Sequence, residues 1–455
     1  MEAFSNFLGT LNGFVWGPWM LTLLVGTGIY LTLRLGFWQF RTLGYALKLA
    51  FSPAKQDKTS EGDISHFQAL MTALAATIGT GNIVGVSTAV VLGGPGAVLW
   101  MWITAIFGMA TKYGEAVLSI KYRITDEHGE MAGGPMYYIE RGLGWKWLAW
   151  LFALFGAVAA FGIGNLVQVN SVAGAVHDTF GLNPWITGLI LAGFTALVIL
   201  GGVKSIGKAT GILVPLMAVF YILGGLYIIF SNLSLVPDAL ALIFTQAFTA
   251  KAGFGALIGT TIRYGVARGV FSNEAGLGSA PIAAAAAKTD HPCRQGLVSM
   301  TGTFLDTIVV CSITGISVVM ANLYPGLDKA QAAALTSRSF EFFIPHLGSL
   351  IVTIALVLFA YSTVLGWSYY GEKCFYYLVG EKGLKPYRII FSICAFFGAI
   401  LKLSLVWDIA DTFNGAMAIP NLIALLLLSG VIASETKDFQ KLRAKEKAEE
   451  IKSAA

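Results

Sequence analysis

Long runs of apolar residues, separated by short polar segments, dominate the chain. A helix that crosses a bilayer needs about 20 largely apolar residues. The stretch from 64 to 111 contains no Asp, Glu, Lys or Arg. Its GGPG at 93–96 is a turn signal, so the stretch predicts one span and the beginning of the next. The pattern predicts eleven transmembrane helices in total, the others near 13–33, 147–176, 185–202, 207–230, 255–287, 296–323, 348–370, 388–401 and 409–432.

Composition agrees with a membrane protein and excludes several other classes. Apolar residues make up 56% of the 455 residues and charged residues only 12%, against about 25% charged residues in soluble domains. A soluble enzyme, a disordered chain and a nucleic-acid-binding protein are therefore poor interpretations. The four cysteines show no CxxC spacing, which predicts neither a disulfide framework nor a metal site. We expect an all-α polytopic membrane protein without a bound cofactor.

The distribution of basic residues predicts the orientation. If the N-terminus lies outside, 24 of the 30 Lys and Arg residues fall in inner segments, four fall in outer segments and two lie within the seventh span. Lys and Arg are enriched in cytoplasmic segments. We therefore expect a multi-pass protein of the cell membrane with its N-terminus outside and its polar C-terminal tail in the cytoplasm.

Eleven spans divide into one extra helix and two sets of five. Two sets with an odd number of helices insert in opposite orientations, which is the inverted repeat of many secondary transporters. This division predicts six segments along the chain. They are an extra N-terminal helix at 1–35, a cytoplasmic linker at 36–65, a first repeat at 66–230, an extracellular linker at 231–254, a second repeat at 255–432 and a cytoplasmic tail at 433–455.

Each set of five begins with a segment that glycine interrupts. The second span reads ATIGTGNIVG from Ala76, and the seventh reads SNEAGLGSAP from Ser272. Glycine lets the chain leave helical geometry, and unwound backbone at membrane depth is tolerated only where it is buried or lines a cavity. The pair predicts two broken helices around a binding site at the membrane midplane. For an isolated G-x-G, close helix packing through small residues is the alternative explanation.

Four motifs resemble the alanine/glycine:cation symporter family. They are GTGNIVGV at 79–86, GGPGAVLWMW at 93–102, GGPMYYIE at 133–140 and NEAGLGSAPIAAAAA at 273–287. The resemblance covers nearly the whole chain. It implies a LeuT-type fold with one extra helix in front, and sodium-coupled uptake of alanine or glycine.

The resemblance also implies a sodium site on the ninth span. In LeuT-type transporters two adjacent hydroxyl residues face carbonyl groups of the first broken helix. By position the hydroxyls correspond to Ser362 and Thr363, and the carbonyls to Ala75 and Ile78. The alternative is that both hydroxyls bond to carbonyls of their own helix, as is common in membrane helices.

A zwitterionic amino acid needs donors for its carboxylate and acceptors for its ammonium group. Backbone N–H groups of Thr80 and Gly81 are candidates for the carboxylate, with the Asn82 amide beside them. Carbonyl groups in the unwound part of the seventh span are candidates for the ammonium group, at Phe271, Ser272 and Asn273.

The fourth and ninth spans add further candidates. Asn165 and Gln168 lie three residues apart and so on one helical face, either toward the substrate or in hydrogen bonds between helices. Trp367 and Phe271 would wall a small cavity and so favour tiny side chains. Aromatic packing without a ligand is the alternative.

Charged residues at membrane depth are functional candidates by default. Asp306, Arg263, Arg268 and Glu274 belong to this group. Arg268 and Glu274 flank the second break and are expected to form a gate or a structural pair. On the third span, the further charges Lys112 and Glu115 are expected to pair at a helix end.

Three other functions remain open on the residues alone. Proton coupling usually needs a titratable group at the cation site, and the second span has none, although Asp306 and Glu274 keep this possibility open. A membrane enzyme would require a His/carboxylate cluster, yet the five histidines lie near loops and form no pair. A channel would not need the hydroxyl pair and the amides of an occluded site. The expected partners are thus the amino acid, sodium and the lipid bilayer.

Overall fold

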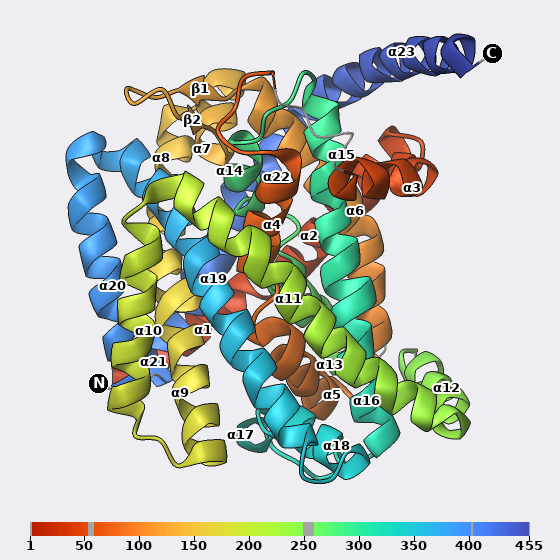
Figure 1. Ribbon diagram of the computed structural model, residues 1–455, viewed down its shortest axis with the longest axis vertical. Helices are drawn as coiled ribbons and strands as arrows, with labels where there is room; N and C mark the ends of the chain where they lie inside the picture. Colours follow the sequence, from red (N-terminus) through yellow and green to blue (C-terminus); the bar gives the residue numbers. More distant parts are fainter. Residues whose placement is uncertain (1, 53–58, 249–258, 402–403, 455) are drawn as a thin grey trace.

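The computed structural model describes residues 2–52, 59–248, 259–401 and 404–454. Helices dominate it, and many of them run along the long axis of the molecule (Figure 1). The two termini lie toward opposite ends of this axis (Figure 1). We call the end with strands β1 (Ile124–Thr125) and β2 (Met131–Ala132) the hairpin end, and the end with helix α12 (Val236–Gln246) the N-terminal end.

The first half of the chain supplies the first broken helix and the helices around it. Ser65 begins α4 with a capping box that it forms with Gln68, which satisfies free N–H groups of the first turn. The helices of this half, besides α12, are α1 (Glu2–Val15), α2 (Pro18–Arg34), α3 (Trp38–Phe51), α4 (His66–Thr77), η2 (Gly81–Gly85), α5 (Val86–Gly93), α6 (Ala97–Lys121), α7 (Pro135–Tyr138), η3 (Ile139–Leu143), α8 (Lys146–Phe161), η4 (Gly162–Leu166), α9 (Val167–Phe180), α10 (Pro184–Ile199), α11 (Gly202–Ser231) and η5 (Leu233–Leu235).

The second half supplies the second broken helix and the long helix α19. Its helices are α13 (Thr260–Asn273), α14 (Ala280–Ala285), α15 (Pro292–Thr303), η6 (Phe304–Cys311), α16 (Ser312–Ala321), α17 (Lys329–Ala332), α18 (Leu335–Phe343), α19 (Gly348–Val379), η7 (Glu381–Gly383), α20 (Leu384–Ile400), α21 (Ser404–Ala416), α22 (Ala418–Leu427) and α23 (Ser429–Ala454). The last of these, α23, projects away from the bundle at the hairpin end (Figure 1).

The number of candidate membrane spans is smaller than the eleven predicted. Among the described residues, seven helices are long and apolar enough to cross a membrane, and the bent pair α4 and α5 makes eight. The three other predicted spans correspond to α6, to the short α10 and to the broken pair α13 and α14. The length and hydropathy of single helices do not identify these three, because α6 contains charged residues, α10 is short and the seventh segment is broken.

The predicted segments contain elements that the sequence pattern did not indicate. The first span, predicted at 13–33, is interrupted at Trp16 and Gly17, so that α1 and α2 are separate helices. The predicted linkers at 36–65 and 231–254 contain the helices α3 and α12. The start of the predicted seventh span, 255–258, lies outside the described residues.

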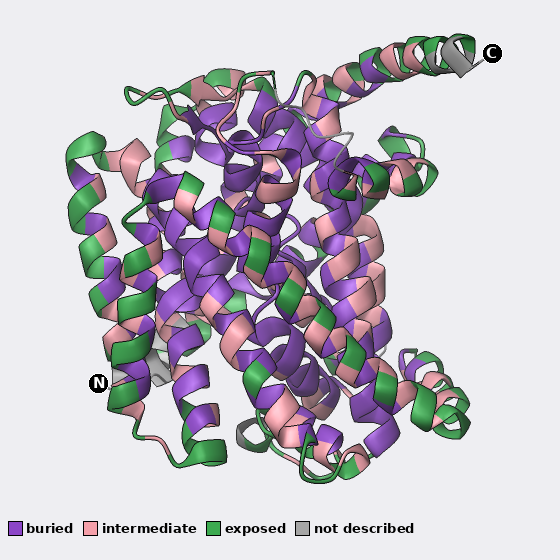
Figure 2. Cartoon of the chain, in the orientation of Figure 1, coloured by how far each residue is buried: buried purple, intermediate pink, exposed green. Residues whose placement is uncertain are grey.

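Large apolar side chains cover the outer faces of the peripheral helices. Leu197 of α10, Ile212 and Leu223 of α11, and Ile389 of α20 are all more than half exposed, and Figure 2 shows exposed residues along these helices around a buried interior. An apolar surface of this extent would aggregate in water. The fold is therefore that of a multi-pass helical membrane protein with lipid-facing sides.

Candidate substrate and cation site

The predicted break in the second span is present. Helix α4 ends at Thr77, Ile78 is extended, and the chain resumes as a π-helical turn at Gly81 before α5. The two halves are bent by 52°. A Cβ atom at Gly79 would lie 2.4 Å from Thr363 Oγ1, so only glycine lets the unwound segment approach α19 this closely.

The seventh segment is broken as well. Helix α13 ends at Asn273, and Glu274 takes a left-handed conformation with φ of 57°. Gly276 and Gly278 follow with φ of 93° and 83°, conformations that glycine adopts without steric cost. The G-x-G of this segment therefore turns the chain between α13 and α14.

A buried carboxylate on α6 holds this second break. Glu115 Oε1 accepts hydrogen bonds from the backbone N–H groups of Gly276 and Gly278, both at 3.1 Å. Asn421 of α22 donates to the same oxygen at 2.7 Å. The prediction that Lys112 and Glu115 lie at a helix end is wrong, because both residues are buried within α6. Their sequence spacing carried no information about the unwound N–H groups opposite.

The hydroxyl pair of α19 faces the first break. Ser362 Oγ lies 3.2 Å from the Ala75 carbonyl oxygen and 3.5 Å from that of Ile78. Thr363 Oγ1 lies 3.4 Å from the Ile78 oxygen. Both hydroxyls are also within 3.0 Å of the Phe359 carbonyl oxygen on their own helix. A hydroxyl that donates its single proton to Phe359 keeps its lone pairs, so back-bonding and cation binding are compatible here.

A cavity opens beside this oxygen cluster and encloses about 280 Å³, including its mouth. Thr363 belongs to both the cluster and the cavity wall. Five of the predicted substrate residues line the cavity, namely Thr80, Gly81, Gln168, Phe271 and Trp367. The remaining lining residues are Ala76, Thr77, Gly79, Ile163, Glu274, Thr363 and Asn414.

The cavity contains polar groups without a protein partner. Among the described residues, the buried Thr80 Oγ1 and Asn414 Oδ1 atoms have no hydrogen bond. Gln168 Oε1 accepts a long hydrogen bond of 3.4 Å from the Thr80 N–H group, and its amide nitrogen donates to the Ile163 carbonyl. Since buried polar atoms are normally paired, these groups indicate a polar ligand. Asn414 was missed by the sequence analysis, although a lone amide in an apolar span is a usable signal.

Two aromatic residues bound the cavity. A Cβ atom at Gly164 would lie 2.2 Å from the Cβ of Trp367, so the tryptophan packs directly on the backbone of η4. Its ring also meets Tyr370 edge to face at 5.6 Å. Phe271 comes from α13 and carries the guanidinium of Arg268 over its ring, 5.5 Å from the centre.

Three predicted residues do not line the cavity: two of them bond to Asp306, and the third bonds to the neighbouring Thr307. Asn82 Nδ2 donates to Asp306 Oδ1 at 2.7 Å, and Ser272 Oγ donates to Oδ2 at 2.9 Å. Thr307 Oγ1 also donates to Oδ2 at 2.7 Å, and Asn273 Nδ2 donates to Thr307 Oγ1 at 3.1 Å. Asp306 therefore ties the two broken helices to each other through their side chains.

Asn165 also faces away from the cavity. Its Nδ2 atom donates to the Phe391 carbonyl of α20 at 2.7 Å, which is the interhelical hydrogen bond considered as the alternative. Asn165 lies within the π-helical turn η4, whereas Gln168 lies in the regular helix α9. A wider turn rotates the two side chains apart, whereas regular helical spacing would place them on one face.

The charged residues beside the second break do not form the expected pair. Glu274 Oε2 accepts from Ser279 Oγ at 2.6 Å, and the buried Lys112 interacts electrostatically with Glu274. Arg268 instead points to the other side of Phe271. The two charges therefore lie on different sides of the same aromatic wall.

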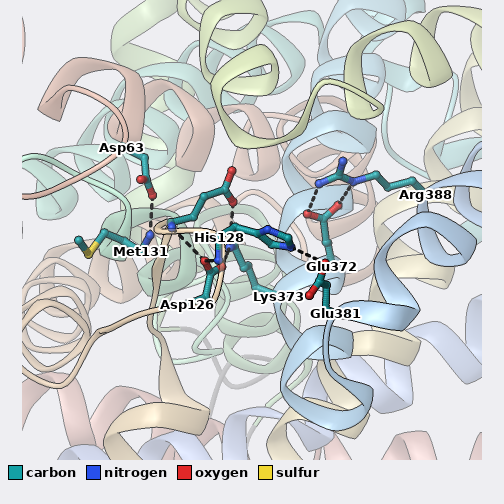
Figure 3. Close-up of polar contacts among 9 residues, drawn as sticks. Asp63, Asp126, His128, Met131, Glu372, Lys373, Glu381 and Arg388 are labelled. Atoms are coloured by element: carbon teal, nitrogen blue, oxygen red, sulfur yellow. Dashed lines mark hydrogen bonds and ion pairs between the residues drawn. The ribbon is translucent and has the colours of Figure 1, made fainter.

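Ion pairs close the hairpin end (Figure 3). The nearly buried Lys373 ammonium lies 3.2 Å from Asp126 and 3.3 Å from Glu130. Arg388 contacts both carboxylate oxygens of Glu372 at 2.6 and 2.7 Å. The Lys373 contacts join the hairpin loop to the end of α19. The Arg388 contacts join the same end of α19 to α20.

Backbone contacts reinforce the same closure. Asp63 accepts from the Met131 N–H group at 2.8 Å (Figure 3), and burial raises the pKa of its carboxyl. Arg123 donates to the carbonyl groups of Ala285 and Ala287 at 2.9 and 2.8 Å. The end of α14 is thereby fixed to the hairpin region.

Comparison with known proteins identifies the family. The model of the sodium:alanine symporter family matches residues 1–453. This chain belongs to the sodium:alanine symporter family. It is a sodium-coupled symporter and not an enzyme. The sodium/alanine symporter AgcS of Methanococcus maripaludis is 69% identical over 97% of this chain and 99% of its own length. The probable sodium/glutamine symporter GlnT of Bacillus subtilis is 40% identical over 96% of this chain and 91% of its own.

A solved structure shares the fold of the symporter at low identity. A manganese transporter variant of Eremococcus coleocola superposes with a TM-score of 0.51 over 81% of this chain and 78% of its own, at 12% identity. At this identity the likeness concerns the fold alone.

Proposed function

We propose that this symporter imports alanine or glycine together with sodium by alternating access. The observation that carries the proposal is the cluster of Ser362, Thr363 and the carbonyl groups of Ala75 and Ile78. It offers four neutral oxygen atoms across a helix break, which suits a hard monovalent cation. Because Thr363 also lines the cavity, cation binding and substrate binding are adjacent and can favour each other.

The cavity suits a small zwitterion. The unpaired Thr80 hydroxyl and the N–H groups of the first break offer donors for a carboxylate. Of the three residues whose carbonyl groups were candidates for the ammonium group, Phe271 lines the cavity, and Glu274 beside it adds a carboxylate as acceptor. Phe271 and Trp367 leave room for a hydrogen or a methyl group as side chain. The name of AgcS supports alanine as substrate.

We also propose eleven membrane crossings in a five-plus-five inverted repeat after an extra helix. The eight candidate spans together with α6, α10 and the pair α13 and α14 make eleven. The two broken helices then occupy matching places at the start of each repeat. In this arrangement the hairpin end and α23 face the cytoplasm and the N-terminus lies outside, as the basic residues predict.

The sodium gradient is sufficient to concentrate the substrate. One charge that enters at 100 mV gains about 2.3 kcal/mol, and a tenfold sodium gradient adds about 1.4 kcal/mol. One sodium ion per cycle thus supports about 500-fold accumulation of a neutral zwitterion.

Uptake by purified protein in liposomes tests the proposal. Labelled alanine and glycine are offered under a sodium, a potassium or a proton gradient, with unlabelled glutamine as a competitor. The proposal expects concentrative uptake with sodium only and weak competition by glutamine. Uptake driven by protons alone would favour the second candidate, a proton-coupled transporter of another small zwitterion that uses the buried Asp306 or Glu274.

A further inference from the structure

Helix α3 lies outside the bundle toward the hairpin end and leaves one of its faces uncovered (Figure 1). Its other face is anchored. Trp38 and Leu49 are buried, and the Tyr45 hydroxyl accepts a hydrogen bond of 3.1 Å from Arg294 of α15. The guanidinium of Arg443, from α23, lies over the Tyr45 ring, 3.9 Å from its centre. Helices α15 and α23 thus hold α3 beside the bundle.

The uncovered face combines aromatic rings with basic side chains. Phe37, just before α3, and Phe40 and Phe51 within it are between 46% and 49% exposed. Arg41 and Lys48 are exposed on the same helix, and neither forms an ion pair with a described carboxylate. Intervals of seven and eleven residues are close to two and three helical turns, so the two basic residues share one side of α3, and so do Phe40 and Phe51.

The sequence around this face contains no acidic residue. Between Glu2 and Asp57 there is no Asp or Glu, whereas four Lys and Arg residues fall in this interval. A cluster of one sign of charge attracts partners of the opposite sign. The uncovered face of α3 therefore favours an anionic partner that also accommodates aromatic rings.

Helix α12 offers a comparison at the other end of the molecule. It lies outside the bundle on the same side as α3 (Figure 1). Phe244 of α12 and Phe248 just after it are more than half exposed, as is usual for helices that lie in a membrane interface. Its sequence VPDALALIFTQ contains Asp238 but no Lys or Arg. Both helices thus expose aromatic rings, and only α3 adds positive charge.

We propose that the uncovered face of α3 binds the headgroups of anionic phospholipids in the leaflet at the hairpin end. Phe40 and Phe51 enter the boundary between headgroups and acyl chains, where aromatic residues are enriched. Arg41 and Lys48 meet the lipid phosphate groups, because basic residues near an anionic leaflet are attracted to its surface. Recognition of the headgroup is independent of the transported solute and of the coupling ion.

Quenching of a fluorescent label by brominated lipids tests which lipid lies beside α3. Gly44 is exposed between Arg41 and Lys48, and a Cβ atom there would meet nothing within 4 Å. A bimane label is attached to Gly44→Cys in a Cys394→Ser background, because the other three natural cysteines are buried. The labelled full chain is placed in nanodiscs that mix phosphatidylcholine with phosphatidylglycerol, and either one lipid or the other is brominated.

We expect phosphatidylglycerol to be enriched beside this label about fivefold or more over its share of the bilayer, since one basic residue near an anionic surface contributes a factor of about five. The double variant Arg41→Gln/Lys48→Gln should reduce the enrichment to less than about twofold. Lys146→Gln is the matched control, because this exposed lysine of the hairpin end lies 3.8 Å from Glu140. It should leave the enrichment unchanged. A label at the exposed Ala241→Cys of α12 should show no enrichment.

Salt provides a measurement that needs no basic variant. Raising the ionic strength from about 0.1 to about 1 M shortens the Debye length from about 10 to about 3 Å, and the enrichment beside Gly44→Cys should fall. Equal quenching by the two brominated lipids that salt leaves unchanged overturns the proposal, because α3 then has no headgroup preference. Absence of quenching by either lipid also overturns it, since water or another protein chain then covers this face. Both leaflets of a nanodisc have the same composition, so neither result depends on the orientation of the chain.

Discussion

The hairpin end and the N-terminal end of the molecule differ in whether their basic side chains form ion pairs. At the hairpin end, Lys373 and Arg388 are each paired with carboxylates, and Asp126 is almost fully buried with its partner. At the N-terminal end, Arg263 and Arg268 have no ion pair with a described carboxylate, and both line a cavity on the other side of Phe271 together with Asp411. The charged side chains of one end are thus joined in ion pairs, whereas the two arginines of the other end form none with a described carboxylate.

This difference indicates which contacts change during transport. Passage toward the hairpin end requires that Lys373 leave Asp126 and Glu130. This step loses much of the interaction free energy of a buried ion pair. Passage from the N-terminal end requires only that Phe271 and the stacked Arg268 move. The ion pairs therefore predict that the hairpin end opens less readily than the other end.

The largest expected effect concerns the first helix break, which lies between the two ends of the molecule. Gly79→Ala places a methyl group 2.4 Å from Thr363 Oγ1 and pushes the first break away from α19. We expect sodium-driven alanine uptake to fall at least about 100-fold, because a small misplacement of binding groups has effects of this size. The control is Gly174→Ala in α9, where a Cβ atom would meet nothing within 4 Å. Normal uptake by Gly79→Ala would show that the break needs no close approach to α19.

The next effect concerns the sealed end. Lys373→Met leaves the buried Asp126 without its cation, which costs about 3–5 kcal/mol for a buried pair. We expect a lower melting temperature, and increased access of thiol reagents to a cysteine placed at Ala76 in the cavity wall. His128→Gln is the comparison, because its pair with Glu381 is about half exposed and is worth at most about 1 kcal/mol. Equal changes in melting temperature and thiol access in the two variants would mean that burial does not determine how much an ion pair contributes to closing this end.

The smallest effect concerns the cavity wall toward the hairpin end. Trp367→Leu should relax the discrimination against valine, because adding methylenes to a filled pocket costs about 1–3 kcal/mol, or about 5- to 150-fold in affinity. Competition of labelled alanine by unlabelled valine measures this ratio. A variant with unchanged selectivity would place the size filter at Phe271, between the two cavities.

The sequence was sufficient to predict both helix breaks, because paired glycines within two membrane spans indicate either unwound backbone or close helix packing. It located the hydroxyl pair and the facing carbonyl groups only through the family resemblance, because spacing alone allowed back-bonding just as well. The distances to Phe359 show why both descriptions fit the same residues.

The side chains of the unwound segments were the least predictable part. Asn82 and Ser272 point to Asp306, because an unwound chain has no fixed period that assigns a side chain to a face. Asn165 and Gln168 diverge because Asn165 lies within a π-helical turn, which changes the helical period before Gln168. Glu115 was missed because it bonds to groups far away in the sequence, and Asn414 was missed because it lines a cavity with residues from distant helices.

The sodium dependence of alanine binding tests the central claim most directly. Thr363→Val keeps the shape of the side chain and removes the oxygen atom shared by the cation cluster and the cavity. Ser368→Ala is the matched control, because this hydroxyl of the same helix bonds to the Leu365 carbonyl of its own helix. We expect the half-saturating sodium concentration to rise about tenfold or more in Thr363→Val, which corresponds to the loss of about 1.4 kcal/mol, and to stay unchanged in Ser368→Ala. An unchanged sodium dependence in Thr363→Val would contradict the account.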